Sequence, residues 1–171
     1  AALVLTGNAT NTTLTITTNA GSICYELAVA RWTTSFDLWR LRYFSAEALA
    51  DPAISGAAAR PDAEGVPNLL KYYLGLPGRT PAPAGSLPTG SLITVSNQLH
   101  LAMTYTHDKL ATDVDCVAEI STDLVNWLSG PAIARIEAIG DQGAQEQITV
   151  QDLMPVANTT HHFMRLRFQQ R

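Results

Sequence analysis

Alternating apolar and polar residues dominate both ends of this chain. Leu14 and Ile16 alternate with threonines, and a second alternating run follows a short turn at residues 19–21. From residue 91 onward the alternation returns at 99–105 and 114–120, and further strand-like stretches lie at 92–95, 133–139, 146–151 and 162–168. Period-two alternation predicts half-buried strands, and short strands separated by turn residues predict an antiparallel sandwich. The sequence therefore predicts a mainly β fold: an antiparallel β-sandwich of immunoglobulin or fibronectin-like type over residues 91–171, preceded by an N-terminal β arm or hairpin over residues 1–30.

The segment between these β regions, residues 31–78, has helical spacing instead. Thr34 or Ser35 can cap a helix that carries Phe36, Trp39 and Tyr43 on one stripe. Aromatic residues at this spacing are more typical of a core than of a binding platform. A connector rich in proline and glycine follows over residues 79–90, and we expect no regular element there.

Residues 60–71 within the helical segment have the skeleton of a calcium loop, D-x-[DN]-x-[DN]-G. Oxygen-bearing side chains occupy its third, fifth and ninth positions, and a glycine occupies the sixth, where the chain must bend: Asp62, Glu64, Asn68 and Gly65. Arg60 and Lys71 stand at the first and twelfth positions, where carboxylates belong. Two cations in these places repel a metal ion, so we expect calcium to bind weakly or not at all, and we expect no other cofactor.

Five runs around and after this loop form a specific combination: residues 36–40, 49–56, 67–72, 116–127 and 163–168. Together they resemble a module at the C-terminal end of large secreted bacterial surface proteins, whose loop is similar to the calcium repeats of dockerins and thrombospondin type 3. The resemblance covers the chain from about residue 32 to its end. It implies a secreted, surface-associated, non-catalytic module, and its metal ligands carry over only to Asp62, Glu64 and Asn68.

Composition excludes several functional classes. The net charge of −4 leaves no basic footprint for nucleic acid, and no apolar run is long enough to span a bilayer. The sequence contains no H-E-x-x-H, no G-x-S-x-G and no phosphate-binding glycine loop. His161 and His162 are adjacent in a predicted strand, so they point to opposite faces and cannot easily share a metal. We therefore expect no enzymatic activity.

The first residues and the cysteines bear on the compartment. A start at Ala1-Ala2 is typical of a mature protein left by signal peptidase, and a trimmed fragment is the alternative. We expect an extracellular or cell-surface location. Cys24 and Cys116 could form one disulfide in an oxidising compartment, or remain as two buried thiols, and the sequence leaves both open.

Two non-catalytic functions fit these observations. The first is a self-assembling subunit of an extracellular filament or surface layer, whose partners are copies of itself. In this function the arm would add a strand to a neighbouring sheet through its apolar residues, which are Leu3, Val4, Leu5, Leu14 and Ile16. The second is an accessory surface-binding module for glycans or proteins that uses exposed aromatics. Only 7% of the residues are aromatic, and most have core-like spacing, which favours the first function.

Overall fold

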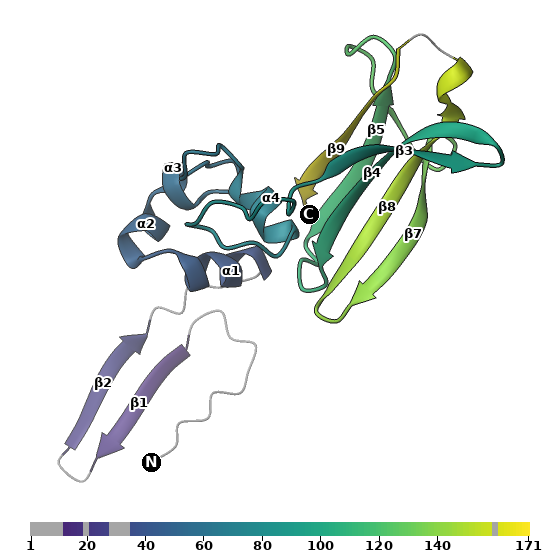
Figure 1. Cartoon of the computed structure of the whole chain (residues 1–171). Helices are drawn as coiled ribbons and strands as arrows, with labels where there is room; N and C mark the ends of the chain where they lie inside the picture. Colours follow the sequence, from purple (N-terminus) through teal and green to yellow (C-terminus); the bar gives the residue numbers. More distant parts are fainter. Residues whose placement is uncertain (1–11, 19–20, 28–34, 159–160) are drawn as a thin grey trace. The chain divides into compact units, whose positions relative to one another are not determined.

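Two strands near the N-terminus, Thr12–Thr18 (β1) and Gly21–Leu27 (β2), pair antiparallel as a hairpin. The computed structural model describes residues 12–18, 21–27, 35–158 and 161–171 (Figure 1). Leu3, Val4 and Leu5 of the predicted arm therefore lie outside the described residues. The chain divides into two units, residues 1–33 and 34–171, which we describe separately.

The larger unit contains two antiparallel sheets. One has four strands in the order β3-β4-β8-β7, with bounds Thr89–Val95, Gln98–Asp108, Gln145–Pro155 and Ala134–Gln142. The other has the order β6-β5-β9, with bounds Leu128–Ser129, Val114–Ser121 and Phe163–Gln170. Between the two sheets β5 contacts β7, and β9 contacts β4. The fold is thus mainly β, as predicted, and its sheets are consistent with a sandwich (Figure 1).

Turn chemistry accounts for the β3–β4 hairpin. Ser96 and Asn97 join the two strands and have φ angles of 50° and 64°. Positive φ at both residues of a two-residue turn matches the right-handed twist of the flanking strands, and asparagine tolerates this region better than most residues. A short 3-10 helix (η1, Val156–Asn158) follows β8.

Four short helices precede the sheets: α1 (Ser35–Tyr43), α2 (Ala46–Ala50), α3 (Pro52–Ser55) and α4 (Asn68–Tyr73). Side-chain caps define the middle two, because Ser45 accepts the backbone N–H of Ala48 and Asp51 accepts that of Ala53. Asp51 therefore ends α2 and begins α3, with proline at the first helical position, where its missing N–H costs nothing. Among the described residues, none of these helices has the length and apolar character that a membrane span requires.

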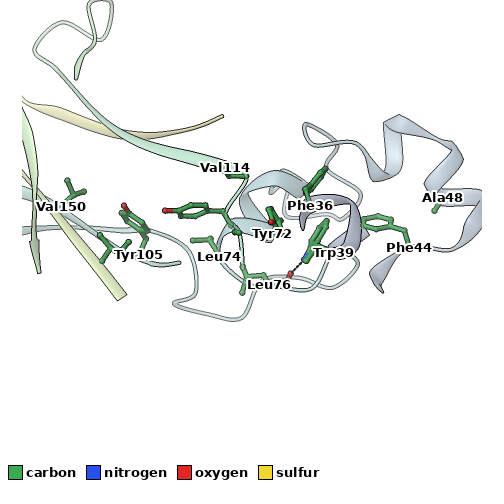
Figure 2. Packing of buried hydrophobic residues seen from close by; sticks show 13 residues of the cluster. Phe36, Trp39, Phe44, Ala48, Tyr72, Leu74, Leu76, Tyr105, Val114 and Val150 are labelled. Atoms are coloured by element: carbon green, nitrogen blue, oxygen red, sulfur yellow. Dashed lines mark hydrogen bonds between the residues drawn. The ribbon is translucent and has the colours of Figure 1, made fainter. Parts of the chain in front are cut away.

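The helices and the sheets of this unit share one core (Figure 2). Trp39 stacks on Phe36 with ring centroids 5.6 Å apart, and its indole N–H donates to the carbonyl of Leu76 at 3.0 Å. On the sheet side, Tyr73 of α4 stacks on His107 of β4 at 4.5 Å and meets Phe168 of β9 edge-on at 5.1 Å. The aromatic stripe of α1 is thus core, as its spacing predicts.

Asp113, directly before β5, joins the helices to the sandwich. Its carboxylate accepts the backbone N–H of Phe36 at 3.1 Å and the hydroxyl of Tyr72 at 2.5 Å. Burial, together with hydrogen bonding to this carboxylate, holds the pKa of Tyr72 well above its usual value. One side chain thereby fixes the first turn of α1 and the face of α4 against the start of β5.

Candidate functional site

Lys71 on α4 fills the centre of the calcium-like loop with its own positive charge. Its side chain is fully buried, and its ammonium donates to the carboxylate of Asp62 and to the carbonyl of Thr80 at 2.7 Å. The same nitrogen lies 3.0 Å from Glu64 Oε1. An ammonium group has three donors, and here three oxygens surround it. The carboxylates at the third and fifth loop positions therefore bind a lysine cation.

Glu64 also connects the loop to the connector that follows. Both of its carboxylate oxygens lie 2.7 Å from the backbone nitrogen of Ala82, which donates to them. Lys71 holds the carbonyl of Thr80 in the same stretch. Gly65 has φ +70°, and this left-handed geometry lets the loop turn directly after Glu64. The ion-pair network thus positions the beginning of the connector at residues 80–82.

Asn68, the third predicted ligand, has a different role in the structure. Its side chain is completely buried, and its amide nitrogen donates to the carbonyls of Ile54 and Gly56 at 2.9 and 3.0 Å. These carbonyls lie at the end of α3, so Asn68 ties that helix to the start of α4. Arg60 is exposed. Within residues 35–158 and 161–171, no cluster of three or more histidine, cysteine or acidic side chains is arranged to hold a metal.

We expect calcium to leave the thermal unfolding of the wild-type protein unchanged, because an ion would have to displace a buried ammonium. The matched variant is Lys71→Glu, which removes this charge and restores a carboxylate at the twelfth position. We expect it to unfold at a lower temperature without calcium and to regain stability in millimolar calcium. Scanning calorimetry with and without a chelator measures both proteins. Sub-micromolar calcium affinity in the wild type would contradict the expectation.

An open edge of the three-stranded sheet is the second notable feature. Along one side, β5 pairs with β9 over its whole length, from Val114 to Ser121. Along the other side it pairs with β6 only at Glu119 and Ile120, because β6 has two residues. Residues 114–118 therefore have no strand partner on this side among the described residues. Unpaired backbone groups of such an edge are a template for another strand.

A groove of about 200 Å³ lies beside this edge, between the two sheets. It is lined mostly by apolar side chains, which include Tyr105, Cys116, Ala118, Ala134, Ile136 and Val150. In the register of β7 with β8, Ile136 and Ile139 stand opposite Val150 and Ile148, two buried core residues. Residues opposite each other share a face of the sheet, yet the two β7 isoleucines are 55% and 58% exposed. The three-stranded sheet thus covers only part of the inner face of the four-stranded sheet, and these two isoleucines lie outside the covered part.

Cys116 lines this groove, and its thiol has no disulfide partner among the side chains that the structure describes. Burial raises the pKa of its thiol to about 11, an effect that hydrogen bonds from the Tyr105 and Tyr73 hydroxyls partly offset. A thiol with this pKa is mostly protonated at neutral pH and reacts slowly. The side chain of Cys24 lies outside the described residues, so its bridge to Cys116 stays a prediction.

A larger pocket, of about 420 Å³, lies at one end of the sandwich. It is mainly apolar, and Asp152 and His162 contribute a buried pair whose carboxylate oxygen and ring nitrogen are 2.9 Å apart. His100 Nδ1 lies 2.9 Å from the carbonyl of Asp152. His161 is exposed while the side chain of His162 is buried, and both lie before β9 rather than in the predicted strand. Sequence reasoning missed the pair, because Asp152 lies in β8 and His162 lies ten residues later, directly before β9, and the two match no motif.

We compared the chain with protein-family models, with curated proteins and with solved structures, and it matches none of them. The geometry described above therefore carries the functional argument.

Proposed function

We propose that this chain is a non-catalytic, self-assembling structural subunit of an extracellular filament or surface layer. The observation that carries the proposal is the β1–β2 hairpin. Its register places Leu14 opposite Tyr25 and Ile16 opposite Ile23, so four apolar residues share one face. The other face carries threonines at positions 13, 15 and 17, with Ser22, Cys24 and Glu26 opposite them. The hairpin is amphipathic, and its apolar face needs a partner.

The small size of this sheet supports the addition of a further strand. The two-stranded sheet contains no other strand from the described residues. A hairpin of two strands is only marginally stable in water, and a third strand or a covering surface stabilises it. Adding the hairpin to the sheet of a neighbouring copy would supply both, through backbone hydrogen bonds and alternate side chains.

Charge and symmetry are compatible with repeated addition. The chain carries a net charge of −4 over 171 residues, so repulsion between copies is small. A contact in which one surface of each copy meets a different surface of the next is heterologous, and it gives an open filament unless its rotation closes a ring. For the sandwich itself we propose the immunoglobulin or fibronectin-like type, which its four-stranded and three-stranded sheets support.

The pocket at the end of the sandwich favours the second candidate function, an accessory module that binds a glycan or a protein. Its volume of about 420 Å³ and its apolar lining with a few polar groups are typical of ligand sites. In that function the chain would work as a monomer. The oligomeric state therefore separates the two candidates.

Deleting residues 1–18 is expected to abolish assembly, because it removes β1 and the residues before it. The full-length chain should form filaments or layers in negative-stain microscopy and sediment as large species, whereas the truncated chain should sediment as a monomer. Its sandwich should still fold, since residues 34–171 have a core of their own.

Two matched double variants test the apolar face without a deletion. Leu14→Asp with Ile16→Asp should prevent assembly, whereas Thr13→Asp with Thr15→Asp adds the same charges to the opposite face and should allow it. If the truncated protein assembles to the same extent as the full-length chain, the arm does not join neighbouring copies and this part of the proposal is wrong. A full-length chain that stays monomeric at all concentrations would instead favour the binding module.

A further inference from the structure

We infer that the open edge of β5, at residues 114–118, accepts strand β1 of a second copy of this chain. The inference rests on the proposed self-assembly and names the surface that receives the arm. It follows from the backbone groups of the edge, the uncovered isoleucines beside it and the pattern of β1.

The backbone provides the first argument. Five consecutive residues of β5 lack a strand partner on this side in the part of the chain that the structure describes. Strand β1 has seven residues, so it can span the whole open stretch. Along a strand, backbone groups alternate between its two sides, so the side of β5 away from β9 presents unpaired donors and acceptors to an incoming strand.

The side chains provide the second argument. A strand that extends the sheet beyond β5 at this level lies over β7, because β5 contacts β7 across the sandwich. It would cover Ile136 and Ile139, which are more than half exposed. Leu14 and Ile16 are two residues apart and share a face, so both can enter the groove while the threonines between and beside them face outward.

Charge does not oppose this docking. Strand β1 contains no charged residue. In the groove the only charged lining residue is Arg135, whose guanidinium lies 3.2 Å from the carboxylate of Glu137. The free edge of β9 differs, because Arg165, Arg167 and Arg171 lie on or directly after that strand and pair with Glu119 and Asp115. Charged side chains on an edge strand discourage pairing with another chain.

We take a second copy as the occupant, because every copy carries both the donor strand and the acceptor edge. Among the described residues β2 is the strand that pairs with β1, and within residues 35–158 and 161–171 the β5 edge at 114–118 has no strand partner beside the groove. In the assembly each copy donates β1 to one neighbour and accepts β1 from another at its β5 edge. The donor strand and the acceptor edge are different surfaces. Each added copy therefore presents a new open edge, and the assembly grows from head to tail.

The test combines two variants that fail for different reasons. Ile136→Asp keeps the donor strand and places a charge in the groove, whereas deletion of residues 1–18 keeps the groove and removes the donor. Neither variant alone should assemble, and an equimolar mixture should form a heterodimer that sediments with the summed mass. The matched control is Leu92→Asp, on β3 at the opposite edge of the same sheet, where the leucine is 56% exposed. It should assemble like the wild type.

A synthetic peptide covering residues 11–19 provides a second readout that does not depend on the folding of a variant. In molar excess it should block assembly of the wild-type chain, and the same peptide with Leu14→Asp and Ile16→Asp should not. If Ile136→Asp assembles like the wild type, or the mixture gives no heterodimer, the β5 edge is not the acceptor, although self-assembly can still hold. If Leu92→Asp alone prevents assembly, the joint lies at β3. If the wild type itself never assembles, the proposed function fails as well.

Discussion

Replacing Lys71 with methionine is expected to lower the free energy of unfolding by about 3–5 kcal/mol, the usual cost of removing one partner from a buried ion pair. The variant keeps most of the apolar stem but removes the ammonium from between Asp62 and Glu64. The Asp62 side chain is 8% exposed and that of Glu64 is 23% exposed, so water can solvate the remaining carboxylates only in part. The carbonyl of Thr80 also loses its donor.

Lys109→Met is the matched control for this prediction. Lys109 pairs with Asp141 at 2.7 Å, but the two side chains are 38% and 76% exposed. Exposed ion pairs contribute about 1 kcal/mol or less, so this variant should unfold close to the wild type. Urea unfolding followed by circular dichroism measures both. Equal stabilities for the two variants would mean that the buried network does not hold the loop.

Trp39→Ala is expected to destabilise the larger unit by about 3–5 kcal/mol, the range for removing a large aromatic from a core. Trp39 is the centre of the helical half of the core, with ring centroids of four aromatic residues within 6.0 Å: Phe36, Tyr43, Phe44 and Tyr72. Its loss leaves a cavity and also frees the carbonyl of Leu76, which accepts the indole N–H. Urea unfolding again measures the change.

Leu38→Ala on the same helix is the control, because its side chain is 60% exposed. A substitution at such a position usually changes stability by about 0.5 kcal/mol or less. The helices and sheets share one core, so Trp39→Ala should lower the midpoint of a single transition. A separate, earlier transition of the helices would show that they fold independently of the sandwich.

Local pattern alone predicted much of the fold. Period-two alternation located β1, β2, β4 and β5, since each strand has to present one apolar face to a core or partner. Short strand-like runs between turn residues located β3, β7, β8 and β9. The helical stripe of Phe36, Trp39 and Tyr43 located α1, with Ser35 as its first residue. Strand β6 was missed, because two residues are too few for any period to be visible.

For the calcium-like loop, the sequence predicted which residues come together, and the tertiary structure decided their contacts. From the sequence, the calcium-like spacing brought Asp62, Glu64 and Lys71 to one place, and the lysine was expected to repel a metal from it. Only the structure decided that the lysine itself occupies the centre, because the burial of its stem depends on how α4 packs. The position of Asn68 against α3 likewise depends on a contact across the fold.

Of the two surfaces proposed for assembly, the sequence predicted the arm, and only the structure revealed the open edge. The sequence determined that the arm is an amphipathic β element, since alternation is a local property of the chain. Which edge is open was decided by strand order, and a short β6 leaves residues 114–118 unpaired while β7 extends beneath it. Strand order results from contacts between residues far apart in sequence, and a one-dimensional pattern does not contain them. For this protein the sequence therefore determined that β1 is an amphipathic strand that a neighbour can accept, and only the tertiary structure decided that the β5 edge is open to accept it.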